Sequence, residues 1–269
     1  PAPRSRSMPA RSDADGLAWH LWLDATPRPG WQNMAIDQTL LEHSAGQGLA
    51  FLRLYRWEPW CLSFGRHEPA ARRYGRGRVE ALGVDTVRRP TGGRAVWHAR
   101  ELTYAVSAPD SFGTLPEAYR RIHHMLRDAV RLLGAPADLA PPPARTPGPA
   151  DGACFAAPVG GEIMVAGRKV VGSAQVRHDG AILQHGAMLL EDDQAMVHAL
   201  AGTSLAVAPE APLSGLLDRR VTFAEAAEAV IAAAAPWCSS WREAEAEDLV
   251  RQARRHEARY RSGDWTWER

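Results

Sequence analysis

The chain has 269 residues, of which 45% are hydrophobic and 23% are charged, as in an ordinary globular protein with room for one large domain or two modest ones. Its formal net charge of +1 argues against a general nucleic-acid binder, which carries a clear basic excess. An odd number of cysteines, three, predicts no disulfide framework and favours reduced thiols in a cytoplasmic enzyme. No apolar run approaches the ~20 residues that cross a bilayer, so we expect no membrane span.

The first half of the chain predicts alternating strands and helices. Residues 1–15 carry charge without the apolar segment of a secretory signal, and we expect a mobile tail. Apolar residues at helical spacing predict a helix over 31–45 and an amphipathic helix over 115–133, with Gly134 as its C-cap. Residues 49–57 alternate apolar and polar side chains and predict a half-buried strand. Further strands are predicted over 17–24 and 61–65 and, as three strands, within 85–109, with partial helix over 69–82.

The second half begins with a proline-rich loop. Residues 135–152 contain proline at a density that excludes helix and interior strand, and this loop leads to Cys154. The turns Ala166-Gly167 and Asp179-Gly180 then separate strand-like runs, and Asp-Gly between strands is a good hairpin signal. Strands are predicted over 162–165, 168–177 and 181–190, and helices over 192–201, 222–235 and 243–260. With no internal repeat and no linker, we predict one catalytic domain over residues 16–269, mixed in α and β, with a helical C-terminal part.

Lys169 is the only lysine in the chain; every other side chain of this charge class is arginine. Arginine stays protonated at ordinary pH, whereas a lysine ammonium is a compact charge that can exchange its proton. This predicts a site that needs such a cation, with a surface lysine of no special role as the alternative. Cys154 lies fifteen residues upstream, and a thiol and an amine that meet in space would form a nucleophile and its activator. An inert buried thiol is the alternative, as we predict for Cys61 and Cys238.

A glycine pair marks a second candidate site. Gly92 and Gly93 follow two arginines, and glycines let backbone N–H groups approach a ligand closely, although a plain tight turn between strands is the alternative. The segment does not match the phosphate-binding motif GxxxxGK[ST]. His98 and His185 are further candidates. Because no His or Cys pair has the short spacing of zinc ligands, we predict no metal site, and we expect the adjacent His123 and His124 to lie on different faces of a helix.

Two separated motifs, RRPTGGRAVWH (residues 88–98) and GRKVVGSAQ (167–175), resemble the lipoate–protein ligase A family, kin to the biotin–protein ligases. The resemblance extends from about residue 22 to residue 200. It implies an α+β fold of mixed sheets with flanking helices, as in biotin ligases and class II synthetases.

Three activities occur in this family. The ATP-dependent ligases typically have a third glycine where this chain has Arg94, and a different continuation where it has residues 99–104. The octanoyltransferase branch is similar at Arg94, at Glu101-Leu102-Thr103-Tyr104, at Ala153-Cys154-Phe155 and at Gln184-His185-Gly186. The amidotransferase branch, which moves acyl groups between lipoyl carriers, resembles the cysteine region less well.

The resemblance implies octanoyl transfer from acyl carrier protein to a lysine of a lipoyl carrier, either the glycine cleavage H protein or an E2 lipoyl domain. Cys154 would form the acyl-enzyme, and Lys169 would stabilise its thiolate and lower the thiol pKa from ~8.5. No cofactor is implied, since ATP and Mg²⁺ belong only to the ligase alternative. A lipoyl- or biotin-domain binding scaffold without activity is the alternative from another class. The implied substrate-binding residues are Arg89, Thr91, Gly92, Gly93, Arg94, His98, Gly172, Ser173, Ala174, Gln175 and His185.

Two further expectations concern the surroundings of this site. Val96, Trp97 and Tyr104 are candidates for the wall of an octanoyl tunnel, with a plain core role as the alternative. Arginines outnumber acids between residues 66 and 89, and this stretch could steer acidic carrier proteins, with a solvated helix face as the alternative.

Overall fold

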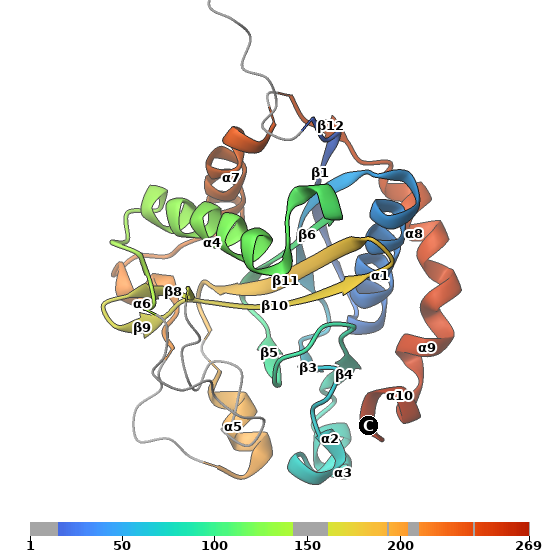
Figure 1. Ribbon diagram of the computed structural model, residues 1–269. Helices are drawn as coiled ribbons and strands as arrows, with labels where there is room; N and C mark the ends of the chain where they lie inside the picture. The colour runs from blue at the N-terminus through green and yellow to red at the C-terminus, as the bar shows by residue number, and fades with distance from the viewer. Residues whose placement is uncertain (1–15, 142–160, 193, 204–209, 239, 269) are drawn as a thin grey trace, which may run out of the picture.

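A large mixed sheet forms the centre of the molecule (Figure 1). The computed structural model describes residues 16–141, 161–192, 194–203, 210–238 and 240–268. Within these ranges the sheet has six strands, in which β1 runs parallel to β2 and β12 and the other neighbours are antiparallel. In spatial order they are β10 (Val171–His178), β11 (Ala181–Leu189), β6 (Glu101–Pro109), β2 (Ala50–Trp57), β1 (Trp19–Arg28) and β12 (Arg242–Glu243).

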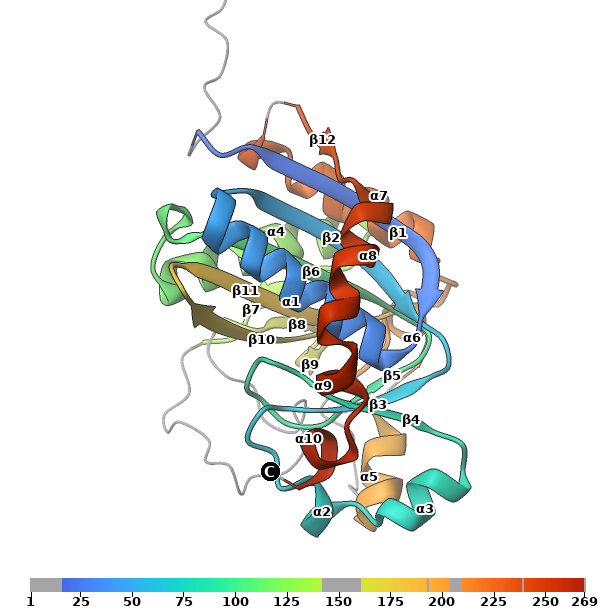
Figure 2. The same ribbon diagram turned by 90° about the vertical axis from the view of Figure 1, so that its right-hand side faces the viewer.

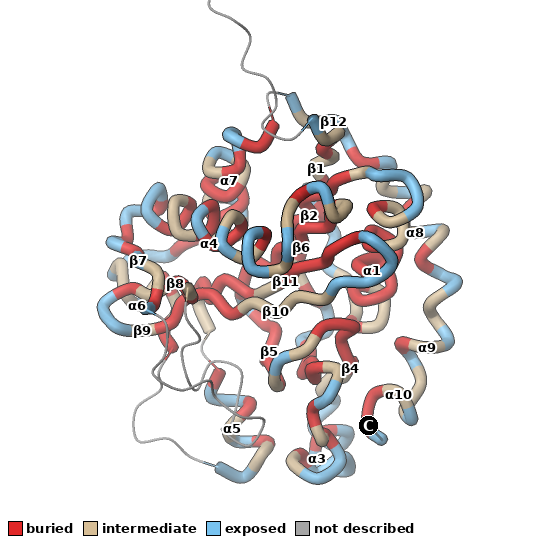
Figure 3. The backbone as a smooth tube through the Cα atoms, viewed as in Figure 1, coloured by how far each residue is buried: buried red, intermediate tan, exposed pale blue. Residues whose placement is uncertain are grey.

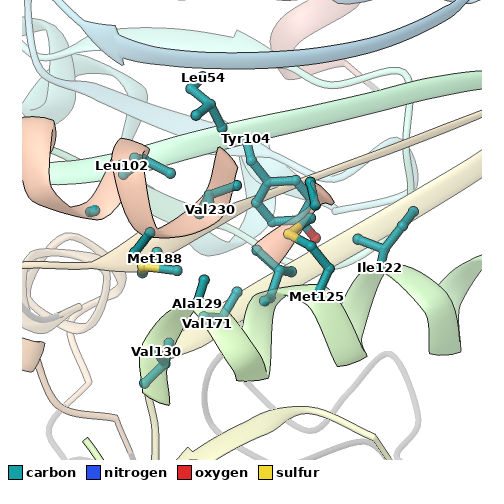
Figure 4. Close-up of a cluster of buried hydrophobic side chains, with 14 of the residues drawn as sticks. Leu54, Leu102, Tyr104, Ile122, Met125, Ala129, Val130, Val171, Met188 and Val230 are labelled. Carbon is teal, nitrogen blue, oxygen red and sulfur yellow. The ribbon is translucent and has the colours of Figure 1, made fainter. Parts of the chain in front are cut away.

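Helices cover both faces of this sheet. α1 (Gly30–Gln47) and α8 (Ala246–Ala253) lie on one face, as Figure 2 shows. α4 (Leu115–Leu132) and α7 (Phe223–Ala233) pack together on the other. The backbone of the central strands is therefore buried, while the outer turns of the helices are exposed (Figure 3). Between α4, α7 and the sheet lies the main core, in which Leu102, Met125 and Val230 meet (Figure 4).

Two small sheets flank the large one, and the remaining helices are short. β3 (Cys61–Phe64) lies between β4 (Asp85–Arg88) and β5 (Val96–His98), and β8 (Ile163–Val165) lies between β7 (Asp138–Leu139) and β9 (Arg168–Lys169). No helix among the described residues has both the length and the apolar character that a membrane crossing requires. The short helices are α2 (Ala70–Arg73), η1 (Asp110–Phe112), α3 (Arg76–Ala81), α5 (Ala195–Ala201), α6 (Leu213–Leu216), η2 (Ala235–Trp237), η3 (Arg254–His256), α9 (Glu257–Arg261) and α10 (Gly263–Trp267).

The predicted α+β class, with mixed sheets and flanking helices, is confirmed, and local sequence signals explain the main elements. α1 ends at Gly48, whose φ of 67° gives the left-handed cap that glycine adopts easily. α4 begins with a capping box in which the Thr114 backbone and side chain are paired with Glu117. The hairpin of β10 and β11 turns at Asp179-Gly180, where both residues have positive φ, as the Asp-Gly pair predicted.

Three expectations about strands are wrong. The run over 168–177 is divided between β9 and β10, which belong to different sheets. The proline-rich segment contains the short strand β7, because Asp138 and Leu139 pair with β8. The glycine pair does not join neighbouring strands: β4 and β5 each pair with β3, so the connection passes over that strand.

The half-buried character predicted for β2 is also wrong, because Arg53 in this strand is completely buried. Its guanidinium donates to Asp24 at 2.7 Å and to Asp37 at 2.9 Å, so both carboxylates compensate the buried charge. Burial alone would lower the pKa of Arg53, but the two carboxylates outweigh it and raise that pKa. A charge at a polar position of the alternating pattern therefore lies inside the protein and not in solvent.

Replacing Arg53 with methionine leaves Asp24 and Asp37 buried without this cation. We expect the free energy of unfolding, measured by urea titration, to fall by about 3–5 kcal/mol, as for broken buried ion pairs. The matched control is Arg72→Met, because Arg72 is an exposed residue of α2, and it should change stability by about 0.5 kcal/mol or less. A loss below about 1 kcal/mol for Arg53→Met would contradict the compensated-charge interpretation.

Candidate active site

A narrow pocket lies between β10, β11 and the segment that follows β4. Its wall is largely apolar, which suits a hydrophobic ligand group. Apolar and glycine lining is contributed by Met34, Trp57, Val96, Ala174, Gly186 and Ala187, together with Gly172. The polar lining residues are Tyr55, Arg89, His98, Thr103, Ser173 and His185.

The side chains of the two adjacent arginines before the glycine pair contact different segments of the chain. Arg88 is completely buried and donates to backbone carbonyls, including those of Gly65 at 2.8 Å and Thr266 at 2.9 Å, which joins the C-terminal segment to β4. Arg89 donates to the Ser63 carbonyl and to the Arg94 carbonyl at 2.7 Å. Because both side chains are buried, they are not available to steer a carrier protein, and this part of the docking expectation is wrong.

The glycines of the motif serve a close backbone contact. Gly93 has a φ of 85°, which glycine adopts without strain. A Cβ atom on Gly65 would lie 1.9 Å from the Gly93 carbonyl oxygen, so the two segments approach as only glycine permits. Gly92 and Arg94 are half-buried on the same turn. The backbone geometry of the turn therefore explains the glycines by itself, whether or not a ligand contacts the turn.

Thr91 and His185 join the turn to the buried ion cluster. His185 Nδ1 lies 2.8 Å from Asp37 Oδ2, and since a carboxylate only accepts, the imidazole donates there. Its Nε2 therefore accepts from the Thr91 hydroxyl at 2.7 Å. Burial lowers the pKa of His185, which keeps the ring neutral. The same Asp37 accepts from Arg53, so the turn, β11 and β2 share one network.

His98 has the same arrangement at the other end of the pocket. Its Nδ1 donates to Glu101 Oε1 at 2.6 Å, and its Nε2 lies 2.6 Å from the Ser63 hydroxyl oxygen, with which it forms a hydrogen bond. Arg89 in turn donates to that hydroxyl oxygen at 2.5 Å. The ring stacks on Trp57 with 4.0 Å between centroids. His98 is thus held by three neighbours, Glu101, Ser63 and Trp57.

Lys169 is buried, with 1% of its surface exposed, so a surface lysine without a role is ruled out. Its ammonium forms an ion pair with Glu162, which is also buried. Lys169 ends β9, and the chain continues directly into β10, where Gly172 and Ser173 line the pocket. Cys154 lies outside the described residues. The predicted meeting of Cys154 and Lys169 therefore stays a prediction.

His123 connects this lysine region to the pocket. It is completely buried on α4 while His124 is exposed, as expected for opposite helix faces. Its Nδ1 lies 2.5 Å from the Gly161 carbonyl and its Nε2 lies 2.9 Å from Ser173 Oγ. Burial, together with the nearby charge of Lys169, lowers the pKa of His123 to about 4. The imidazole is therefore neutral at physiological pH.

Of the residues predicted to bind substrate, six line the pocket and five do not. Thr91 lies behind His185, the turn holds Gly92, Gly93 and Arg94, and Gln175 lies farther along β10. Val96 lines the pocket, whereas Trp97 packs in a separate cluster and Tyr104 lies in the main core. Those that line it are Arg89, His98, Gly172, Ser173, Ala174 and His185.

Sequence reasoning missed the buried partners of these residues. Asp37 lies within a helix predicted from its apolar spacing, which also contains Glu42, so the sequence does not single it out. Glu101 stands in a quoted motif without a role, and His123 was considered only as a metal ligand. Asp37 acts on His185 and His123 acts on Ser173, both of which are distant in sequence, so spacing offers no signal for these two pairs. Glu101 differs, because its partner His98 is only three residues away.

His123 predicts a pH dependence of stability. Its pKa is about 4 in the folded protein and about 6.5 in an unfolded chain. Between these values the unfolded chain binds more protons, so stability is full above about pH 6.5 and falls as the pH drops toward 4. This group should remove about 2 kcal/mol of unfolding free energy between pH 7 and pH 5. Urea titrations at the two pH values measure the loss.

The variant His123→Asn removes this titration, so its stability should fall less between pH 7 and pH 5 than that of the unsubstituted protein, by about 2 kcal/mol. The exposed neighbour provides the control, because His124→Asn should retain the full pH dependence. An unchanged pH dependence in His123→Asn would show that the histidine is not the group responsible.

Comparisons with known proteins agree with this architecture. Residues 29–235 match the lipoyl protein ligase A/B catalytic domain. The octanoyltransferase LipM of Exiguobacterium sp. is 42% identical over 188 residues, which cover 66% of this chain and 68% of that protein. LipM of Symbiobacterium thermophilum is 38% identical over 215 residues, covering 77% and 78%.

The fold has a solved counterpart as well. The crystal structure of lipoate-protein ligase A bound with ATP superposes with a TM-score of 0.74, covering 93% of this chain and 98% of that one, at 23% identity. At that identity the likeness concerns the fold alone, and it confirms the predicted lipoate ligase architecture. Since a family match over residues 29–235 and these relatives agree with the motifs around the pocket, the chain belongs to the lipoyl protein ligase A/B catalytic domain family.

Proposed function

We propose that this protein is an octanoyltransferase, which moves an octanoyl group from octanoyl-acyl carrier protein to a specific lysine of a lipoyl-carrier protein. Relatives at about 40% identity carry the name octanoyltransferase LipM. The chain contains both residues that the proposed chemistry needs, a cysteine at 154 and a single lysine at 169. The acceptor would be the glycine cleavage H protein or an E2 lipoyl domain, in the cytoplasm.

The observation that carries the proposal is the position of Lys169 relative to the apolar pocket. The lysine is buried directly before β10, and Gly172, Ser173 and Ala174 of that strand line the pocket wall. An alkyl chain in the pocket gains from apolar contact, while its activated carbonyl needs a charged group nearby. A buried cation three residues before the first lining residue of β10 suits a thioester whose chain occupies the pocket.

The proposed reaction has two steps. The Cys154 thiolate attacks the octanoyl thioester carbonyl, the C–S bond to the carrier breaks, and the carrier thiolate leaves. The amine of the target lysine then attacks the new thioester, an amide forms, and Cys154 leaves as thiolate. The proton that the amine loses is taken up by a thiolate. Because the donor is already a thioester, no nucleotide is required.

Lys169 would assist both steps as a cation that can exchange a proton. Its charge stabilises the Cys154 thiolate, and its ammonium can protonate a leaving thiolate. Glu162 would hold the ammonium in place, since the ion pair is buried and both partners are fixed. An arginine could supply the charge without the proton, which gives a physical reason for the one lysine among many arginines.

The ATP-dependent ligase is the second candidate, because the fold matches a lipoate–protein ligase whose structure holds ATP. Arg94 departs from the glycine typical of ligases, which favours the transferase. In a ligase ATP would activate a free acid, so the need for a nucleotide separates the two candidates directly.

The first test uses octanoyl-acyl carrier protein and the apo form of the H protein, without ATP or Mg²⁺. We expect octanoyl-H protein to accumulate, read by intact mass. Without the acceptor, the enzyme itself should gain one octanoyl group, and Cys154→Ala should lose both the adduct and the transfer. The conservative control Cys61→Ala, at a buried core thiol, should keep the adduct. Transfer that begins only when ATP and free octanoate are supplied would refute the transferase and support the ligase.

The second test replaces Lys169 with arginine, which keeps the charge and removes the exchangeable proton. We expect the rate of transfer to fall by about 100-fold or more, in the range of general acid–base catalysis. Circular dichroism and the melting temperature check that the bulkier side chain is accepted. The neighbouring exchange Arg168→Lys is the matched control and should retain most of the activity. Near-normal turnover by Lys169→Arg would mean that proton exchange at this position is incidental.

A further inference from the structure

The polar side chains that line the pocket direct their hydrogens away from it. The Tyr55 hydroxyl donates to Asp37 at 2.9 Å, and the Trp57 indole donates to Thr103 Oγ1 at 2.7 Å. The Thr103 hydroxyl donates in turn to Glu101 at 2.5 Å. Burial, with Asp37 beside it, raises the pKa of Tyr55 well above its usual range, so the phenol keeps its proton. These three donors are therefore all occupied by acceptors of the protein.

The two lining histidines follow the same rule. His185 and His98 each donate the Nδ1–H to a buried carboxylate, Asp37 and Glu101 respectively. Their second nitrogens are hydrogen-bonded to the hydroxyls of Thr91 and Ser63, so neither ring offers a donor to a ligand. The two carboxylates thus accept the ring hydrogens of both histidines, which therefore point away from the pocket.

Ser173 is the one pocket hydroxyl whose direction must be derived. The Gly161 carbonyl only accepts, so His123 Nδ1 donates to it and His123 Nε2 must accept from the Ser173 hydroxyl. Tyr104 lies 2.7 Å from Ser173 Oγ and receives a hydrogen bond from Gln184, so the phenol donates to Ser173. The Ser173 hydrogen is therefore used on His123 and is not offered to a ligand in the pocket.

Arg89 completes the set. Its terminal nitrogens donate to the carbonyls of Ser63, Gly92 and Arg94 and to the Ser63 hydroxyl oxygen. The guanidinium therefore braces the turn. Among the lining side chains that the structure describes, the hydroxyl, indole and imidazole donors and the terminal nitrogens of Arg89 each have a hydrogen-bond partner within the protein.

We propose that this arrangement makes the pocket selective for saturated, unsubstituted acyl chains and that it rejects chains carrying an oxo group. The inference rests on the proposed function, since it names the acyl class that the same pocket takes. An oxo oxygen accepts hydrogen bonds from water and loses them on entering the pocket, where side-chain donors are already occupied. The alkyl chain has no such loss, so the two chains differ in affinity although they differ little in shape.

The first measurement is binding by isothermal titration calorimetry with octanoate, 6-oxooctanoate and 6-methylideneoctanoate. The last has a C=CH2 group of nearly the shape of C=O that accepts no hydrogen bond. We expect 6-oxooctanoate to bind about 10- to 100-fold more weakly than 6-methylideneoctanoate, as for one unpaired buried acceptor. Equal affinities for these two ligands would overturn the proposal.

The second measurement restores a donor. Val96 lines the pocket, and Val96→Thr places a hydroxyl on a side chain of nearly the same shape. We expect the affinity ratio between the two ligands to narrow by severalfold, while Val96→Ala, which adds space and no donor, should leave it unchanged. If the ratio changes equally in both variants, shape and not hydrogen bonding sets the preference, and the proposal fails.

These binding constants do not depend on the chemical step. Octanoate that binds in the pocket while octanoyl-acyl carrier protein fails to acylate Cys154 would refute the proposed function and leave the selectivity standing. Conversely, acylation of Cys154 at similar rates by octanoyl and 6-oxooctanoyl thioesters would keep the function and overturn the selectivity.

Discussion

The buried carboxylate of Asp37 is the interaction on which the site depends. It accepts hydrogen bonds from Arg53, Tyr55 and His185, which come from the centre of the sheet and from its β11 strand. A buried carboxylate is costly unless it is paired and fully hydrogen-bonded, so these three partners are held in fixed positions. Because Tyr55 and His185 line the pocket, the same compensation that stabilises the core also sets the pocket wall.

The arginine–glycine motif has a structural explanation that does not require a ligand. Arg88 donates to carbonyls of the 65–68 segment and of the C-terminal helix, whereas Arg89 braces the turn that follows. Lysine has no planar fork of donors and would not join several carbonyls at once. Both arginines and the close approach of Gly65 to Gly93 are therefore parts of one joint between the small sheet and the C-terminal segment.

The lysine region and the acyl pocket are connected by neutral hydrogen bonds. His123 links Gly161, next to Glu162, to Ser173 on the pocket wall, and it is kept neutral by burial and by the charge of Lys169. A charged imidazole there would face a buried ammonium. The site thus separates two environments: an ion pair at the lysine, and a pocket whose charged lining side chain, Arg89, donates to carbonyls of the adjacent turn.

Periodicity and turn chemistry in the sequence determined most elements, including α1, α4 and the hairpin at Asp179-Gly180, because these depend on neighbouring residues. The single lysine and two motifs pointed to the family and to Lys169. Tertiary structure alone decided that Arg53 is buried, that Lys169 pairs with Glu162, and that Asp37 binds His185 across 148 positions of the chain. Such pairings arise where the sheet brings distant strands together, and local spacing contains no record of them.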